Sequence, residues 1–204
     1  MKLRSKTKDR ILLEARNIIL NEGISAFTLR KLGKALGIKA SSIYEHYQNK
    51  KEILNALRNQ CLEALYLKMK KVLAMKKTEK EQLLYLGESY IEFSMDEKEL
   101  FQLFFSNFET NRKSIYETHD LNSPYKLLFD IFLKIQPKLR KERQEELALG
   151  YWSLIHGLAV LRNSFLSSFQ VKWREPQKRM LLIYINGAIN LENNPSRMRN
   201  DFKI

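Results

Sequence analysis

The 204-residue sequence contains one cysteine, three histidines, and far fewer acidic residues than basic ones. A single cysteine, Cys61, excludes an intramolecular disulfide and a cysteine-based metal cluster, and the three histidines are too scattered for a ligand cluster. Cys61 lies at helical spacing from Leu57 and Leu65, so we expect a buried structural thiol rather than a redox sensor. We therefore expect no metal and no cofactor, and a reducing cytoplasm fits this cysteine usage.

A long uninterrupted hydrophobic run is also missing. The basic N-terminal residues 1–8 are followed by a segment that Arg10, Glu14 and Arg16 interrupt with charge. We expect neither a signal peptide nor a transmembrane span, no membrane partner, and a cytoplasmic location.

Acidic residues are scarcest where basic residues gather. The formal net charge is +13, and residues 1–51 hold 12 Lys and Arg against 4 Asp and Glu, whereas the rest of the chain holds 24 against 19. This uneven distribution gives the N-terminal quarter the basic character of a module that binds phosphates.

Residues 28–51 have the pattern of two short helices joined by a tight turn, followed by the start of a third helix. Thr28 is an N-cap residue type, and Gly37 is the residue type that commonly follows the end of a helix. Residues 39–47 are expected to form the second helix, with Ile43 and Tyr47 on its inward face. The first side chains of this helix are small, hydroxylated or basic, which suits entry into the major groove of DNA. Tyr44 can donate a hydrogen bond to a phosphate oxygen. The pattern predicts a helix-turn-helix.

An ordinary helical hairpin with solvated lysines is the alternative interpretation of this stretch. The caps, the turn and the apolar register agree with one another, which favours the helix-turn-helix. For two residues the alternative stays open: Tyr47 fits a core aromatic better than a DNA contact, and His46 also fits a packed ring with a polar tip.

The sequence at these positions resembles the tetracycline-repressor (TetR) family of bacterial transcription regulators over about residues 8–57. The resemblance is carried by Phe27-Thr28, by the Leu-Gly-Ile turn at 36–38, by the run from Ile43 to Tyr47, and by residues 49–52. It implies that the second helix approaches DNA and that two further residues hold phosphates. The residues implied to approach DNA are Lys39, Ala40, Ser41, Ser42, Tyr44 and His46, and those implied to hold phosphates are Thr28 and Lys50. Ala40 stands where many members place a polar reader, so it offers a methyl contact.

Helical patterns continue through the rest of the chain. A long helix is expected to begin at Asn49, where Asn49 and Glu52 form a capping box, and further boxes are expected at Thr78 with Glu81 and at Asp96 with Glu99. Thr7 is expected to cap the first helix, and Ser123-Pro124 to start a later one. The remaining patterns predict helices over about 140–169 and from Glu175 onward. We expect an all-α fold of about nine helices.

Two domains follow from these patterns. Residues 1–48 are expected to form a three-helix DNA-binding domain with the helix-turn-helix, and residues 49–204 an α-helical ligand-sensing and dimerisation domain. A polar, lysine-rich break lies at residues 70–80. The Trp-x-x-x-His-Gly run from Trp152 to Gly157 resembles the C-terminal domain of one branch of the same family.

The second domain is expected to hold a pocket for a small apolar or aromatic effector and to form a homodimer through its last two helices. The expected pocket residues are Leu65, Tyr66, Met69, Tyr90, Phe93, Phe101, Phe104, Phe105, Tyr125, Phe129 and Trp152. Aromatic residues at helical spacing also commonly fill a core, so either role is open for each of them. The expected interface residues are Gly150, Gly157, Leu161, Leu181, Ile185 and Gly187, since glycines permit close helix approach and flanking apolar stripes need burial.

These sequence features bear on three classes of function. The leading prediction is a ligand-responsive repressor that binds a near-palindromic DNA operator as a dimer. An architectural DNA binder without a ligand would have little need for the large aromatic C-terminal half. An enzyme is not expected, because the best constellation, His156 near Trp152 or Cys61, contains no Ser-His-acid order, paired carboxylates, phosphate loop or metal spacing.

Overall fold

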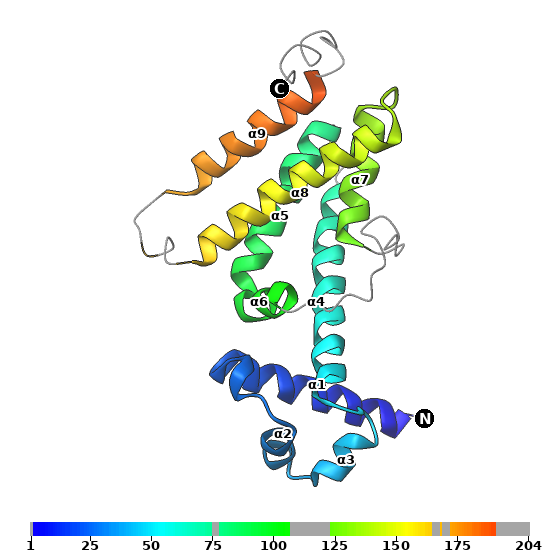
Figure 1. The fold of residues 1–204 in the computed structure, drawn as a ribbon, viewed down its shortest axis with the longest axis vertical. Coiled ribbons are helices and arrows are strands. Elements are labelled where there is room, and N and C mark those ends of the chain that lie inside the picture. The colour runs from blue at the N-terminus through cyan, green and yellow to red at the C-terminus, as the bar shows by residue number, and fades with distance from the viewer. Residues whose placement is uncertain (1, 75–77, 107–122, 165–167, 169–171, 191–204) are drawn as a thin grey trace, which may run out of the picture. The chain divides into compact units, whose positions relative to one another are not determined.

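The structure is a computed structural model that describes residues 2–74, 78–106, 123–164, 168 and 172–190. All regular structure in these residues is helical, with nine α-helices and one 3-10 helix (Figure 1). The chain divides into two compact units, one made of residues 1–64 and 97–112 and the other of residues 65–96 and 113–204. The all-α fold class is therefore confirmed, whereas the domain boundary after residue 48 remains a prediction.

The first unit is built on α1 (Lys2–Glu22), the 3-10 helix η1 (Ile24–Ala26), α2 (Leu29–Leu36) and α3 (Ala40–Tyr44). The first part of α4 (Lys50–Leu73) and α6 (Lys98–Ser106) complete it. Its core consists of apolar residues that recur at helical spacing along these elements, which is why short helices such as α3 are stable here. The fully buried members include Ile11, Ala15, Phe27, Leu32, Ile43 and Ile53.

Two expectations about helix ends in this unit are wrong. Helix α1 already begins at Lys2, so Thr7 lies inside the helix and does not cap it. Helix α3 is shorter than expected, since it runs from Ala40 to Tyr44 with Lys39 as its N-cap. Residues 45 and 46 turn the chain, and Tyr47 donates its backbone N–H to the Ile43 carbonyl at 2.9 Å.

Two expected capping boxes are present. The backbone N–H of Glu52 donates to Asn49 Oδ1 at 2.9 Å, although the Glu52 carboxylate accepts from the N–H of Gln48 rather than from that of Asn49. Thr78 and Glu81 exchange both bonds of the motif, at 3.3 and 3.0 Å. Each box satisfies backbone donors that the first turn of a helix leaves without partners.

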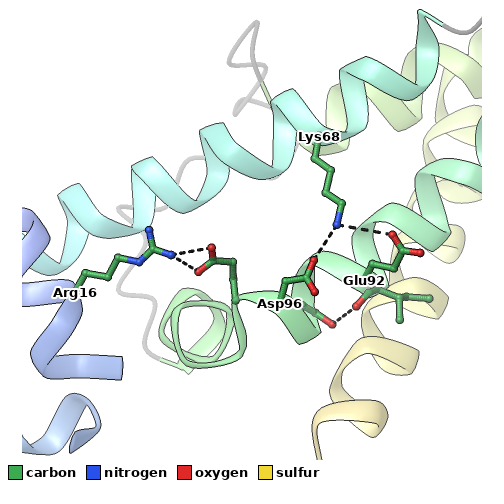
Figure 2. Close-up of polar contacts among 7 residues, drawn as sticks. Arg16, Lys68, Glu92 and Asp96 are labelled. Atoms are coloured by element: carbon green, nitrogen blue, oxygen red, sulfur yellow. Dashed lines mark hydrogen bonds and ion pairs between the residues drawn. The ribbon is translucent and has the colours of Figure 1, made fainter. Parts of the chain in front are cut away.

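The third expected box, at Asp96, is not what the structure shows. Asp96 is the last residue of α5 (Glu79–Asp96), and its carboxylate accepts from the Lys68 ammonium group at 3.1 Å. Glu92 lies one turn earlier, 3.8 Å from the same ammonium nitrogen (Figure 2). Glu97, the next residue, binds Arg16 of α1 through both carboxylate oxygens, at 2.8 and 2.6 Å.

The second unit contains the remainder of α4 together with α5, α7 (Pro124–Ile135), α8 (Lys141–Asn163) and α9 (Arg174–Asn190). Helix α7 begins with proline directly after Ser123, as expected. Helix α5 packs against α7, α8 and α9. A close approach lies at Gly87, where an added Cβ would stand 2.5 Å from the hydroxyl of Tyr151. That hydroxyl donates to the Leu83 carbonyl at 2.7 Å, so the tyrosine is fixed in place and α5 requires glycine at this position.

The single cysteine behaves as expected. Cys61 of α4 is buried, and burial, with a smaller effect from Glu97, raises the pKa of its thiol to about 12. A thiol with this pKa carries almost no thiolate at neutral pH, which is the form that redox chemistry needs.

Candidate nucleic-acid interface

Helix α2 is delimited by the two residues that the sequence singled out. The Thr28 side chain accepts a hydrogen bond from the backbone N–H of Lys31 at 3.1 Å. At the other end Gly37 has a φ of 67°, in the left-handed region that favours glycine, and its N–H donates to the last turn of the helix. The chain therefore reverses sharply after Leu36 and re-enters the core at Ile38.

A second glycine, which the sequence did not single out, holds the two helices of the motif together. The N–H of Ile38 donates to the Gly33 carbonyl at 3.0 Å. A Cβ on Gly33 would lie 2.9 Å from the Ile38 carbonyl oxygen and 3.7 Å from Ile43 Cδ1 of α3. Because the nearest atom belongs to the backbone, a side chain here would push α2 and the turn apart. The signal in the sequence was a glycine inside an otherwise good helix, which commonly marks a close backbone approach.

Helix α3 presents one face to the core and another to solvent. Ile43 is fully buried, whereas Lys39, Ala40 and Ser41 are exposed and Ser42 is half-buried. Tyr44, at the end of the helix, is 54% exposed, so its hydroxyl is accessible to a partner. The structure therefore brings the predicted reader residues together on one short exposed surface, which we call the reader surface (Lys39 to Ser42 and Tyr44).

The two residues with open alternatives lie just beyond α3. Tyr47 is buried, and desolvation raises the pKa of its hydroxyl, with smaller contributions from Asp9 and Glu52. It is thus a core aromatic, as its helical spacing suggested. His46 is half-buried, and its Nδ1 atom is buried without a hydrogen-bond partner in the structure.

Lys50 has a role that neither spacing nor resemblance indicated. Its ammonium group donates to the Phe27 carbonyl at 2.6 Å and lies 3.4 Å from the Ile24 carbonyl, 5.4 Å from the centroid of the Phe27 ring. These contacts join the start of α4 to the segment directly before Thr28. The implied phosphate contact of Lys50 remains a prediction, and the structure adds a function in positioning the cap of α2.

The comparisons with known proteins agree with this geometry. Residues 11–57 match the sequence profile described as bacterial regulatory proteins, tetR family, and this range contains the core of the first unit, the whole α2-turn-α3 motif and the start of α4. Over these residues the chain is similar to the bacterial regulatory proteins of the tetR family.

Solved structures with similar folds extend over almost the whole chain. A Rhodococcus sp. RHA1 protein of unknown function has a TM-score of 0.70 at 16% identity and covers 90% of this chain and 93% of its own. A TetR variant from Acinetobacter baumannii AYE in complex with minocycline has a TM-score of 0.64 at 14% identity, covering 90% and 94%. PfmR, a TetR family transcriptional regulator from Thermus thermophilus, has a TM-score of 0.57 at 19% identity, covering 89% and 97%. No curated protein sequence matches the chain.

The predicted pocket residues do not all belong to one unit. Phe101 is buried in the first unit, and the side chains of Phe104 and Phe105 lie outside the described part of the structure. The remaining eight belong to the second unit, where six are buried and two, Tyr125 and Trp152, are half-buried. The six buried residues are Leu65, Tyr66, Met69, Tyr90, Phe93 and Phe129.

Four aromatic rings of the second unit form a connected cluster, which we call the aromatic cluster (Tyr90, Tyr125, Trp152 and His156). The Trp152 ring lies edge-on to Tyr90 at a centroid distance of 5.0 Å and to Tyr125 at 5.9 Å. The Tyr90 hydroxyl and His156 Nδ1 are 3.1 Å apart, within hydrogen-bond distance. Burial lowers the pKa of the His156 imidazole, so the neutral ring predominates at pH 7.

The predicted interface residues divide into two groups. Leu181 and Ile185 are fully buried within the single chain, and Gly150 accommodates Tyr184 of α9, whose hydroxyl would lie 2.3 Å from an added Cβ. These three residues therefore pack inside the second unit. Gly157 and Gly187 are exposed, with no atom within 4 Å of an added Cβ, and Leu161 is 45% exposed.

The described residues contain neither a metal-binding cluster nor a membrane-spanning helix. No group of three or more His, Cys, Asp or Glu side chains in the described ranges is arranged to hold a metal ion. No helix within those ranges combines the length and the apolar character needed to cross a membrane.

The contacts of Lys50 lead to a stability prediction. Replacing Lys50 with alanine removes the donor from the Phe27 carbonyl, so we expect the free energy of unfolding of the first unit to fall by about 1–2 kcal/mol. The matched control is Lys34→Ala, which removes the same charge from an exposed position of the same unit. Hydrogen exchange of the backbone amides of residues 27–44, measured at increasing urea concentration, gives the free energy of unfolding of each variant. Equal stabilities of the two variants would contradict the assigned role.

Proposed function

We propose that the chain is a dimeric transcriptional repressor that binds a near-palindromic operator and is released by a small apolar or aromatic effector. The observation that carries the DNA-binding part is the reader surface, exposed on a helix that Gly33, Gly37 and Lys50 hold in a fixed position. In this proposal residues 1–48 form the reading domain and residues 49–204 the sensing and dimerisation domain.

In this proposal some of these residues read bases, and others contact phosphates and so position the DNA backbone. Lys39, Ala40 and Ser41 lie at the N-terminal end of α3, the end that contacts base edges when a recognition helix enters the major groove. Thr28 at the start of α2 and Tyr44 at the C-terminal end of α3 carry hydroxyl groups suited to phosphate oxygens. Ser42 and His46, both half-buried, contribute secondary contacts.

This division is tested by comparing single variants on duplexes that differ by one base pair. Changes at Lys39, Ala40 or Ser41 should alter which bases are preferred, by about 1–3 kcal/mol per base pair. Thr28→Ser, which keeps the capping oxygen, and Tyr44→Phe should leave the preference unchanged, and Tyr44→Phe should weaken binding to every duplex alike. If no variant of the first three positions changes the preference, α3 does not read the bases.

The dimer is proposed to form through exposed apolar residues of α8 and α9. Ile183 of α9 is 72% exposed and Met180, one turn away, is also exposed. On α8, Val160 and Leu161 are exposed next to Gly157, where no side chain keeps a partner helix at a distance. A surface of this kind loses contact with water when a second copy covers it. This assignment replaces Leu181 and Ile185 of the sequence-based interface with Met180 and Ile183.

Sedimentation velocity tests the proposed dimer. The wild-type chain should sediment as a dimer, and Ile183→Glu should shift it to the monomer because an unpaired carboxylate would be buried in the interface. The matched control is Leu13→Glu, which places the same charge on an exposed leucine of α1 in the other unit. A dimer that persists in Ile183→Glu would place the interface elsewhere.

The effector site is proposed to include the aromatic cluster of the second unit. Trp152 and Tyr125 are half-buried, so part of each ring surface is still available to a ligand. The Trp-x-x-x-His-Gly run places Trp152 and His156 one turn apart on α8, facing Tyr90 of α5. One protein of similar fold was solved in complex with minocycline, which supports a small-molecule effector for this unit.

A screen of planar hydrophobic compounds tests this assignment. A true effector should raise the melting temperature and, by linkage, weaken DNA binding, since it binds one of two states more tightly. Trp152→Ala should abolish both effects, whereas Tyr85→Ala, at an exposed aromatic of α5, should preserve them. A compound that stabilises the protein without changing DNA affinity would show a pocket that is not coupled to DNA binding.

A further inference from the structure

A hollow of about 560 Å³ lies in the first unit, beside the end of α3. Its lining includes Tyr44 of the reader surface, His46 and Gln48 of the following turn, and Lys8 of α1. The sequence indicated a DNA contact for Tyr44 and His46, but it gave no role to Lys8. The hollow therefore places an additional cation next to residues already expected to meet the DNA backbone.

Lys8 is held at this position without losing its charge. Its ammonium nitrogen lies 5.4 Å from the centroid of the Tyr47 ring, and Tyr47 is fixed in the core. A cation–π contact of this kind orients the ammonium group but leaves its net charge unneutralised. Other lysines of the unit are engaged differently: Lys31 pairs with the Glu22 carboxylate, and Lys50 donates to backbone carbonyls.

Two carboxylates, those of Glu45 and Glu52, also line the hollow. The Glu52 carboxylate accepts from the backbone N–H of Gln48 at 2.5 Å and lies in the first turn of α4, where a helix favours negative charge. Such a site is a poor trap for a free anion. Because the two carboxylates repel anions, a phosphate is expected in the hollow only as part of a duplex that α3 already binds.

We infer that Lys8 is a phosphate-positioning residue, and that a backbone phosphate of the bound DNA lies at this hollow, contacting the Lys8 ammonium group and the Tyr44 hydroxyl. The inference rests on the proposed function, since the duplex has to be seated by α3 first. It assigns α1 a direct part in DNA binding in addition to its part in the core of the unit.

The test is the salt dependence of binding to a duplex of random sequence, because phosphate contacts do not depend on sequence. Each phosphate contact contributes about 0.9 to the slope of log affinity against log salt concentration. Lys8→Gln should lower the magnitude of that slope by about 0.9, and Lys8→Arg should retain it.

The matched control is Arg10→Gln, which removes the same charge from an exposed position on the same helix. Two residues along a helix correspond to a rotation of roughly 200°, so Arg10 faces away from Lys8. The control should leave the slope unchanged, because a charge that contacts no phosphate releases no counterions on binding.

The outcomes separate this inference from the proposed function. A wild-type chain that shows no salt-dependent binding to DNA would overturn both. Salt-dependent binding with equal slopes for wild type and Lys8→Gln would overturn the inference alone, as would a lowered slope in both Lys8→Gln and Arg10→Gln. A fall in the urea midpoint of Lys8→Gln that accounts for the lost binding would assign Lys8 to stability and would also overturn it.

Discussion

The close contact between Gly33 of α2 and the Ile38 carbonyl is the constraint on which the reader surface depends. It allows the turn at Gly37 to lie directly against α2, and so fixes the direction in which α3 leaves the core. Helix α3 has only five residues and would not be stable alone, so its position is set by this contact and by the burial of Ile43. The exposed residues of α3 are therefore held in a fixed orientation, which a protein needs in order to read bases at defined positions.

The second unit is stabilised by a different type of contact. Tyrosine hydroxyls donate to backbone carbonyls of neighbouring helices. Tyr151 of α8 donates to the Leu83 carbonyl of α5, and Tyr184 of α9 donates to the Leu147 carbonyl of α8. Gly87 and Gly150 make room for these two tyrosines. Buried Gln136 similarly donates to the Ala188 carbonyl near the end of α9. These polar contacts inside an apolar core fix the helices at specific positions, which the proposed sensing function needs if a ligand is to distinguish between two arrangements.

Much of this architecture was predictable because it depends on local signals. Thr28, Gly37, Asn49 and Thr78 each mark a helix end through a backbone requirement that involves only nearby residues. The signals failed where distant partners decide the outcome. Asp96 resembled a cap but pairs with Lys68, and Leu181 had the spacing of an interface residue but packs inside its own unit. Lys50 and Lys8 have roles set by a carbonyl and a ring that lie more than twenty residues away, and spacing along one helix carries no information about such contacts.

Selection of binding sites from random duplex DNA by the 204-residue chain tests most directly whether two reader surfaces bind DNA together. Two reader surfaces related by a twofold axis should meet half-sites about 34–36 Å apart, one turn of DNA or a multiple of it. We expect enrichment of a near-palindrome whose half-site centres are separated by about one helical turn or a multiple of it. Recovery of no enriched sequence, or of a single asymmetric site without a repeated half, would contradict it.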